Sequence, residues 1–272
     1  MQLDYSKPLL MGVLNVTPDS FSDGGMYPSS KDAITRGLEM VEQGADIIDI
    51  GGESTRPGAE RIDATEQKRR VLDVIAGLRK ELPPSISISI DTTLSEVAKA
   101  ALDAGATMLN DVSAGREDEA LLKLAASSNV PICLMHMQGD PGNMQDNPSY
   151  ENVTREVSGY LLERAKHAES LGVNKSNIIL DPGIGFGKRT QHNLELLRDL
   201  KQIVELGYPV LLGTSRKRFM GDIADEENPN RRMPATCATS ALGVMAGVKI
   251  FRVHDIWQNR QALDVTNAIQ TS

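Results

Sequence analysis

Short apolar runs recur along this chain, and each run ends at or just before a residue that can bind a ligand or take part in chemistry. The eight runs are LLMGVLN (9–15), DIIDI (46–50), ISISID (86–91), TMLND (107–111), PICLMH (131–136), NIILD (177–181), PVLLG (209–213) and KIFRVH (249–254). Runs of this length are typical of strands that are buried on both faces. The pattern therefore predicts eight strands whose carboxyl ends carry functional side chains.

The segments between these runs have the apolar spacing of helices. Their apolar residues recur every three or four positions, as with Ile34, Leu38 and Val41 in one segment and Leu194, Leu197, Leu200 and Val204 in another. A glycine stands where several of these helices should end: Gly44, Gly105, Gly172, Gly207 and Gly247. Glycine there can take the left-handed conformation that ends a helix at little cost.

Alternating strands and helices predict a parallel sheet with helices packed against it. Eight such units in 272 residues match the size of a closed (β/α)8 barrel, or TIM barrel, formed by one domain over residues 1–272. An open, doubly wound sheet is the alternative, but no GxGxxG motif follows the first strand and no break in composition divides the chain. In a barrel the carboxyl ends of all strands meet, so we expect a single site there.

Composition narrows the possible functions. A net charge of -8 and a pI near 5.1 disfavour nucleic-acid binding, which needs a positive face. The longest uncharged apolar stretch, around SALGVMAGV, is too short to span a bilayer, and MQLDYSKPLL has no export signal. Cys133 and Cys237 belong to no metal-spaced cluster, so we expect reduced thiols. These observations predict a cytoplasmic enzyme that acts on small molecules and has no nucleic-acid or membrane partner.

Two long connections near the N-terminus are rich in Gly, Ser, Pro and Asp. They are VTPDSFSDGGMYPSS (16–30) and GGESTRPGAERIDAT (51–65), and both follow predicted strands. Loops of this length are usually functional, and at the catalytic end of a barrel they could close over a substrate. The alternative is that they only decorate the surface.

Eight motifs, spread from the first strand to the last, together resemble the dihydropteroate synthases, the pterin-binding barrel enzymes of folate synthesis. They are GVLNVTPDSFSDGG (12–25), DIGGESTRPGA (49–59), SIDT (89–92), LNDVS (109–113), LMHMQG (134–139), LDPGIGFGK (180–188), TSRK (214–217) and RVHD (252–255). The first two are the most specific, whereas SIDT or LND alone would be weak. Ile184 stands where family members often have Phe, and residues 222–232 match nothing in the family.

The resemblance implies a reaction, a cofactor and an assembly. Enzymes of this family join 6-hydroxymethyl-7,8-dihydropterin diphosphate to p-aminobenzoate and release pyrophosphate with the help of Mg²⁺. Family members form homodimers through the late helices, and the acidic stretch from Glu226 to Pro229 could lie near that interface. They are also the targets of sulfonamides, which mimic aminobenzoate, although the sequence does not fix how sensitive this chain is.

Three polar residues at strand ends suit the pterin ring. A pterin presents ring N–H donors, an amine and a carbonyl, and we expect Asp91, Asn110 and Asp181 to face them. Alternation along ISISID turns Ser87, Ser89 and Asp91 to one face, toward the barrel axis. In the alternative interpretation these residues are solvated or cap helices, as Asp91 could before TTLSEV.

A second group of residues suits the diphosphate. Arg252 and His254 are two residues apart on the last predicted strand, so both should face the interior and bind phosphate oxygens. By resemblance Arg252 also stacks on the pterin, Asn15 donates its amide oxygen to Mg²⁺, and Thr55 helps to neutralise the leaving group. Taken singly, a strand-end Asn is usually a turn residue and a lone His a core residue.

The remaining candidates surround the second substrate. By resemblance Lys217 contacts the pterin carbonyl and Ser215 the benzoate, although a Lys in a basic run such as TSRKR is commonly only solvated. The aminobenzoate slot would be completed by Phe21, Arg56, Pro57 and Phe186. The string GIGFGK is not a P-loop, because Pro182 and Arg189 stand where that motif needs Gly and Ser or Thr.

The residues also suggest a mechanism. No nucleophile and base are paired in the motifs, and the neutral arylamine of aminobenzoate needs no strong base. We therefore expect a dissociative substitution in which pyrophosphate leaves before the amine attacks, with Asp91, Lys217, Arg252 and His254 as catalytic residues. Two alternatives stay open: a methyltetrahydrofolate methyltransferase, which needs no Mg²⁺ or diphosphate site, and a non-catalytic pterin-binding homologue, which should lack some site residues.

Overall fold

The computed structural model describes residues 3–17, 29–54, 61–139 and 142–272. Its strands are β1 (Leu9–Asn15), β2 (Ile47–Gly51), β3 (Ser87–Asp91), β4 (Met108–Asp111), β5 (Ile132–Met135), β6 (Ile178–Asp181), β7 (Leu211–Leu212) and β8 (Ile250–Val253). Its helices are α1 (Ser30–Glu42), α2 (Ala64–Glu81), α3 (Ser95–Asp103), α4 (Ala120–Ser128), α5 (Val153–Ser170), α6 (Thr190–Arg198), α7 (Leu200–Val204), α8 (Arg218–Ala224), α9 (Met233–Ala246) and α10 (Ile256–Thr271), with short 3₁₀ turns η2 (Lys175–Asn177) and η3 (Pro229–Arg231).

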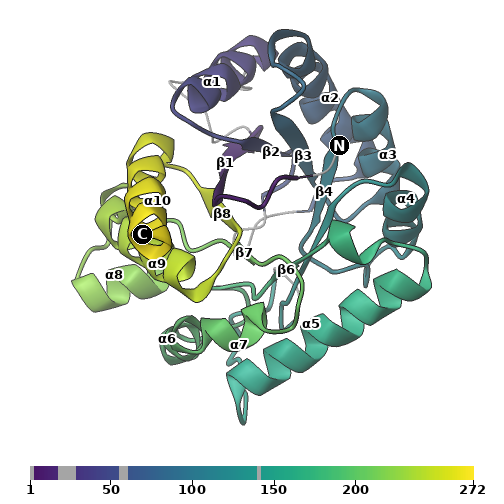
Figure 1. Cartoon of the computed structure of the whole chain (residues 1–272). Coiled ribbons are helices and arrows are strands. Elements are labelled where there is room, and N and C mark those ends of the chain that lie inside the picture. Colours follow the sequence, from purple (N-terminus) through teal and green to yellow (C-terminus); the bar gives the residue numbers. More distant parts are fainter. Residues whose placement is uncertain (1–2, 18–28, 55–60, 140–141) are drawn as a thin grey trace.

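The eight strands form one parallel sheet that closes on itself. Strands are hydrogen-bonded in the order β6-β5-β4-β3-β2-β1-β8-β7, and a parallel bridge between Leu180 and Val210 joins the two ends. At this closure the backbone N–H of Leu180 donates to the carbonyl of Pro209 at 2.9 Å. The strands lie in the middle of the molecule and the helices surround them (Figure 1). This confirms the predicted single-domain α/β barrel.

Alternate residues of each strand face the helices or the barrel interior. Ile88 and Ile90 are fully buried against the helices, whereas Ser87, Ser89 and Asp91 are buried on the opposite face, as the alternation predicted. The interior near the amino ends of the strands is filled by one apolar cluster, which we call the barrel floor. It comprises Leu3, Leu9, Met11, Ile47, Met108, Cys133, Ile179, Leu211 and Ile250. Polar side chains are therefore concentrated toward the carboxyl ends.

The predicted helix-ending glycines adopt the expected backbone conformation. Gly44, Gly105, Gly172, Gly207 and Gly247 all have positive φ, between 80° and 115°. At Gly105 an added Cβ would also lie 2.7 Å from the Arg79 side chain. These positions thus end the helices and return the chain to the next strand.

Two predicted elements differ from the structure. The apolar pattern from Leu194 to Val204 suggests one helix, but Asp199 separates α6 from α7, because its backbone leaves the helical region and its carboxylate accepts from Thr154 and Arg198. Side chains of this kind compete with helical backbone bonds. The run at 209–213 forms only the two-residue strand β7, since Pro209 has no N–H to donate.

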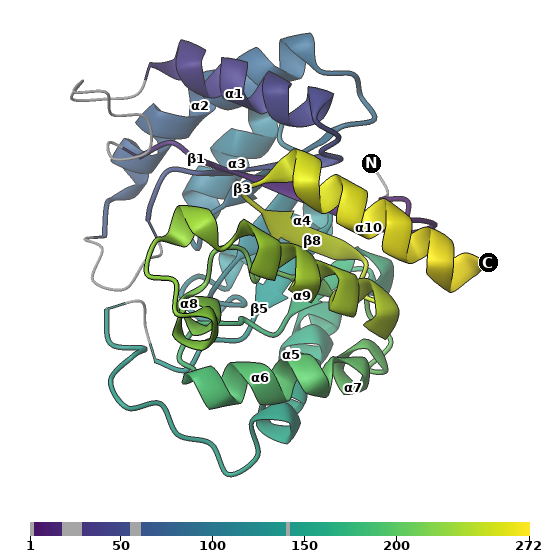
Figure 2. The ribbon, with the colours of Figure 1, turned by 90° about the vertical axis from the view of Figure 1, so that its left-hand side faces the viewer.

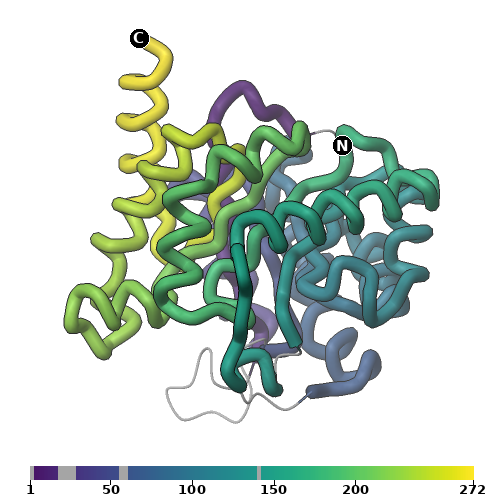
Figure 3. The backbone as a smooth tube through the Cα atoms, turned by 90° about the horizontal axis from the view of Figure 1, so that it is seen from below, coloured from purple at the N-terminus to yellow at the C-terminus, as the bar shows by residue number. Residues whose placement is uncertain are grey.

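The late helices lie on one side of the barrel. In Figure 2, α9 and α10 run side by side, and α10 ends at the C-terminus, which projects from the body in Figure 3. In the described part of the chain, no helix is long and apolar enough to cross a membrane. Cys133 in β5 and Cys237 in α9 are both free thiols.

Candidate active site

The ends of the first three strands place two oxygen-bearing side chains beside one glycine. Strand register pairs Asn15 with Gly51 and Gly51 with Asp91. A Cβ added to Gly51 would lie 3.4 Å from Asn15 Oδ1 and 3.6 Å from Asp91 Cβ. The absence of a side chain at Gly51 therefore lets Asn15 and Asp91 approach each other at the carboxyl end of the barrel.

Arg252 connects three strands in the barrel interior. Its Nε donates to Asp49 Oδ2 at 2.7 Å and its Nη2 to Asp91 Oδ2 at 2.9 Å. Asn110 Nδ2 donates to the same Asp49 oxygen at 3.0 Å. We call Asp49, Asp91 and Arg252 the acid–arginine cluster. It joins β8 to β2 and β3, and Asn110 extends it to β4.

The electrostatics of this cluster are set by burial. Asp49 has no exposed surface and Asp91 is 8% exposed, so both carboxylates are removed from water. Burial and the neighbouring Asp49 raise the pKa of Asp91, and Arg252 opposes this. One guanidinium thus compensates two carboxylates, and the centre of the site favours a ligand that brings hydrogen-bond donors or positive charge.

Asp181 lies near Arg252, at the end of β6. An ideal Cβ on Gly213 would be 3.9 Å from both Asp181 Oδ2 and Arg252 Cβ. Asp181 Oδ1 accepts from the backbone N–H of Gly183 at 2.7 Å. Burial raises the pKa of Asp181, while this bond and Lys217 lower it. The carboxylate therefore has one oxygen committed to the loop that follows β6 and another directed toward the barrel interior.

Lys217 and Phe186 lie against each other across two connections. Lys217 Nζ is 4.0 Å from the centre of the Phe186 ring, a cation–π contact. Burial and the charge of Arg252 lower the pKa of Lys217 to about 8. A cation and an aromatic face are thus presented side by side at this end of the barrel.

His254 and Ser215 also form a pair. Ser215 Oγ accepts the backbone N–H of His254 at 3.1 Å and lies 2.9 Å from its Nδ1. Burial, together with Arg216 and Arg252, lowers the pKa of His254 to about 3. The imidazole is therefore neutral at pH 7, and it can offer a hydrogen bond to phosphate but no positive charge.

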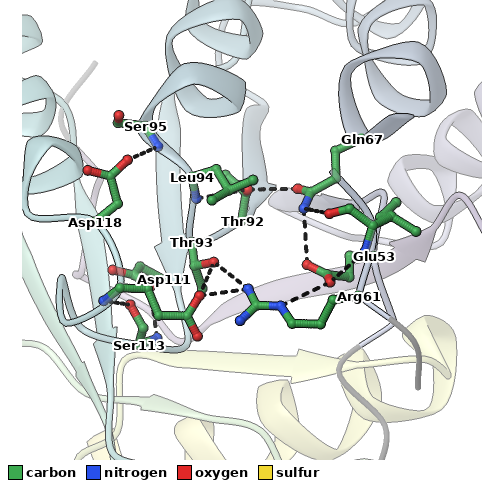
Figure 4. A network of polar contacts seen from close by, with 12 residues as sticks. Glu53, Arg61, Gln67, Thr92, Thr93, Leu94, Ser95, Asp111, Ser113 and Asp118 are labelled. Atoms are coloured by element: carbon green, nitrogen blue, oxygen red, sulfur yellow. Dashed lines mark hydrogen bonds and ion pairs between the residues drawn. The ribbon is translucent and has the colours of Figure 1, made fainter. Parts of the chain in front are cut away.

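A polar network surrounds the same end of the barrel (Figure 4). Arg61 Nη2 donates to Glu117 Oε2 at 2.6 Å and to Thr93 at 3.2 Å, and Arg61 Nε lies 3.4 Å from Glu53. Gln67 then bonds Glu53 at 3.0 Å. Glu53 and Arg61 stand on either side of residues 55–60, so the network ties both sides of that connection to the segments after β3 and β4.

Most of the site residues predicted from sequence lie at this end of the barrel: Asn15, Asp91, Asn110, Asp181, Phe186, Ser215, Lys217, Arg252 and His254. Phe21, Thr55, Arg56 and Pro57, and with them most of the two long connections, lie outside the described residues. The alternative role of Asp91 as a helix cap is wrong, because Asp118 accepts the first N–H of α3 at Ser95, 2.8 Å away. Asp91 instead pairs with Arg252.

Asp49 lies at the centre of the cluster, although no role for it is predicted from the sequence. The sequence pattern does place Asp49 inside the barrel, because alternation along DIIDI turns Ile47 and Asp49 to the same inner face. An Asp fully buried between isoleucines needs a partner inside the barrel. That partner, Arg252, comes from a strand about two hundred residues later, so spacing alone could not identify it.

Comparisons with known proteins identify the family of this chain. The sequence profile of a family described as "Pterin binding enzyme" matches residues 11–254. The dihydropteroate synthase of Synechocystis sp. is 45% identical over 260 residues, which are 96% of this chain and 89% of that protein. The Yersinia pestis dihydropteroate synthase, solved with a sulfonamide, has a TM-score of 0.93 at 37% identity, covering 100% of this chain and 98% of that chain. The Xanthomonas albilineans enzyme, solved with 7,8-dihydropteroate, has a TM-score of 0.89 at 40% identity, covering 99% and 96%.

Proposed function

Because the chain belongs to the dihydropteroate synthase family of pterin-binding enzymes, we propose that it condenses 6-hydroxymethyl-7,8-dihydropterin diphosphate with p-aminobenzoate in folate biosynthesis. The products are 7,8-dihydropteroate and pyrophosphate, so the enzyme is a transferase of the dihydropterin-methyl group. The observation that carries this proposal is the acid–arginine cluster with Asp181 and Lys217 beside it. It presents acceptors to a heterocycle and cations to an anion at the same end of one barrel.

The pterin would be read by the buried oxygens. Asp181 has an oxygen directed toward the interior, and the bond from Asn110 Nδ2 to Asp49 leaves the amide oxygen of Asn110 to accept a ring N–H. Lys217 can donate to the pterin carbonyl. Burial makes each of these bonds selective, since a ligand that failed to pair would leave a dry polar group unsatisfied.

The aminobenzoate would bind beside Phe186 and Lys217. The ring of Phe186 supplies an apolar face for the aromatic ring, and the hydroxyl of Ser215 supplies a polar contact for the carboxylate. The contributions of Phe21, Arg56 and Pro57 to this slot stay predictions, because these residues lie outside the described ranges.

Magnesium fits the oxygen of Asn15. Among the described residues no group of three or more His, Cys, Asp or Glu could hold a metal by itself. Mg²⁺ usually keeps several waters and binds one or two protein oxygens together with substrate phosphates, and Asn15 Oδ1 beside Gly51 offers such an oxygen. When bound, the ion would supply positive charge to the leaving diphosphate.

The protein's own residues then favour departure of the leaving group before attack. His254 would stabilise pyrophosphate by a hydrogen bond from its imidazole, whose pKa burial and the neighbouring arginines lower in the ligand-free protein. The two carboxylates of the acid–arginine cluster outnumber its guanidinium and would stabilise a cationic pterin methylene. The neutral arylamine attacks without a strong base.

An assay of pyrophosphate release tests this function. We expect purified protein to release pyrophosphate and form dihydropteroate when it is given both substrates and Mg²⁺, and to lose both activities in EDTA. Pterin diphosphate and Mg²⁺ without aminobenzoate should give slow release through capture by water. If no pyrophosphate forms with both substrates while the pterin still binds, the protein is a non-catalytic homologue. Methyl transfer from methyltetrahydrofolate would identify the methyltransferase instead.

We further propose a homodimer formed through α9 and α10. Large apolar side chains are exposed on these neighbouring helices: Leu242 (46%), Met245 (56%), Trp257 (56%), Val265 (61%) and Ile269 (67%). Exposed apolar patches of this kind usually mark interfaces. In the stretch from Glu226 to Pro229, on the same side of the barrel, Glu226 is half-buried and the other three residues are exposed, and its place near the interface stays a prediction.

Light scattering would measure the assembly. We expect the wild type to have the mass of two chains and the double variant Val265→Glu, Ile269→Glu to have the mass of one. The matched double variant Lys99→Glu, Lys123→Glu, on α3 and α4, should stay dimeric. A monomeric wild type would refute the proposal.

We also propose a cytoplasmic location, which the two free thiols support, because secreted proteins more often pair their cysteines. Fractionation of cells that express the protein should find it with the soluble cytosolic enzymes. Recovery from the membrane or an oxidising compartment would contradict this.

A further inference from the structure

The loop between β6 and α6 has an unusual backbone. Gly183, Gly185 and Gly187 all have positive φ. A Cβ on Gly183 would lie 1.9 Å from the carbonyl oxygen of His136, and one on Gly187 would lie 2.5 Å from that of Gln138. The loop therefore lies directly on the chain that follows β5. Three glycines make this path possible but do not select it, because glycine is equally free to adopt others.

Side chains select it: Gln145, Asn193 and Tyr150 hold the backbone of Gly185 and Gly187, and Lys188 holds that of Gly183 and Phe186. This lysine is only 3% exposed, and its Nζ contacts His136 Nδ1 at 2.9 Å, Gly183 O and Phe186 O at 3.0 Å, and His136 O at 3.3 Å. All four atoms are acceptors. Within the described chain its ammonium makes no ion pair with a carboxylate, so its donors join its own loop to His136, at the end of β5.

These contacts reach the site through Phe186. Lys188 holds the carbonyls of Gly183 and Phe186, and Asp181 holds the N–H of Gly183. The ring carried by this backbone is the one that lies 4.0 Å from Lys217 Nζ. A change in the path of the loop would therefore move the aromatic face of the site.

We infer that Lys188 is a positioning residue: its ammonium occupies a cage of carbonyl oxygens, as a metal ion would, and fixes Phe186 for the second substrate. The inference rests on the proposed function, because it concerns the affinity of the same site for aminobenzoate. Because Lys188 is only 3% exposed, we expect it to touch neither substrate.

The surroundings of the ammonium agree with this role. Burial and the positive charges of Lys188 and Arg116 lower the pKa of His136 to about 2, so its ring is neutral and Nδ1 can accept. Burial lowers the pKa of Lys188 to about 7, while Asp181 raises it and Lys217 lowers it. Burial thus disfavours the charged form, and the acceptors around Nζ, together with the charge of Asp181, offset that cost.

Steady-state kinetics of Lys188→Met and Lys188→Ala test the inference. We expect the KM for aminobenzoate to rise roughly 10- to 100-fold, the effect of losing charge-assisted hydrogen bonds, while kcat and the KM for pterin diphosphate change less than about threefold. Ammonium or methylammonium ions should restore the aminobenzoate KM of Lys188→Ala, because they fit the emptied cage. Tetramethylammonium, which has no N–H, should not restore it.

Lys249→Ala is the matched control. Lys249 also donates to a backbone carbonyl, that of Tyr5 at 3.3 Å, but beside the barrel floor. We expect its aminobenzoate KM to equal that of the wild type. An unchanged KM in both Lys188 variants, or an equal rise in Lys249→Ala, would overturn the inference.

Hydrogen exchange separates this inference from the proposed function. Peptides covering residues 183–187 should exchange faster in Lys188→Met than in the wild type, whether or not the enzyme turns over. If the wild type releases no pyrophosphate, the proposed function fails and the role in aminobenzoate binding fails with it. If the wild type is active and residues 183–187 exchange at the same rate in Lys188→Met, the proposed function stands. Only the inference that Lys188 fixes the loop is then refuted.

Discussion

Two carboxylates share one guanidinium at the centre of the barrel. Arg252 uses Nε for Asp49 and Nη2 for Asp91, at 2.7 and 2.9 Å, and this geometry needs the planar fork of arginine. A lysine has a single nitrogen and could not span both acids in this way. The sequence predicts that Arg252 binds phosphate. The structure shows that Arg252 also holds the two carboxylates of the acid–arginine cluster.

Asp181→Asn tests the pterin-reading oxygen. We expect kcat/KM for pterin diphosphate to fall roughly 30- to 1000-fold, because about 2 to 4 kcal/mol is lost when a dry site no longer pairs with substrate. The amide oxygen can still accept from Gly183, so thermal unfolding should change little. Stopped pyrophosphate assays and thermal melts measure the two effects.

Asp111→Asn is the comparison for that variant. Asp111 is also fully buried at a strand end and accepts backbone N–H groups, from Ser113 and Gly115. We expect Asp111→Asn to lower the melting temperature clearly and to change kcat/KM only slightly. If Asp181→Asn lost stability but kept its kcat/KM, the role of Asp181 in binding would be wrong.

At the scale of elements, the strands were the most predictable part of the chain. Alternation within one strand identifies inner and outer faces, and so the sequence placed Asp91 correctly inside the barrel. It could not reveal that Asp199 ends α6, because that depends on a bond from Thr154 in α5. The same limit explains why Asp49 was missed, since its partner Arg252 comes from a distant strand, and why Lys188 was missed, since two of its four contacts are to the distant His136.

The connection after β7 is held by an ion pair between Arg216 and Asp255, which follows β8. Arg216 has a φ of 61°, which is unusual for a residue with a side chain. Its Nη2 and Nε donate to the two carboxylate oxygens of Asp255, at 2.7 and 3.1 Å. This pair ties the segment bearing Ser215 and Lys217 to the end of β8, next to His254. Backbone strain of this kind persists only when the surroundings hold it.

Asp255→Asn should therefore loosen the connection. We expect kcat/KM for both substrates to fall about tenfold, since a charge-assisted fork is replaced by a single neutral bond. Asp46→Asn is the control, because Asp46 pairs with Arg260 at 3.1 Å beside the barrel floor. Equal losses in the two variants would mean that the fork stabilises the fold in general and does not position Lys217.

At the scale of the whole molecule, a buried neutral histidine couples stability to pH. Burial lowers the pKa of His136 from 6.5 to about 2. Above pH 6.5 the histidine is neutral in both states, so its full contribution to stability is present. As the pH falls from 6.5 toward 2, His136 becomes protonated in the unfolded chain but stays neutral in the folded protein. The free energy of unfolding therefore decreases.

His136→Asn should remove this pH dependence while keeping an acceptor for Lys188. We expect the difference in free energy of unfolding between wild type and variant to fall by roughly 1 kcal/mol per pH unit below pH 6.5. Urea unfolding at pH 7, 6 and 5 measures it. The same slope in both proteins would show that His136 is not the group responsible.

The barrel floor determines where substrates can enter and products can leave. Its core side chains, such as Met11, Ile47, Met108 and Ile250, have no exposed surface, so the strands enclose a dead end rather than a tunnel. Substrates and products must then enter and leave through the carboxyl end of the barrel. An aminobenzoate molecule bound early would stand in the path of incoming pterin, which favours an order in which the heterocycle enters first and the finished conjugate leaves last.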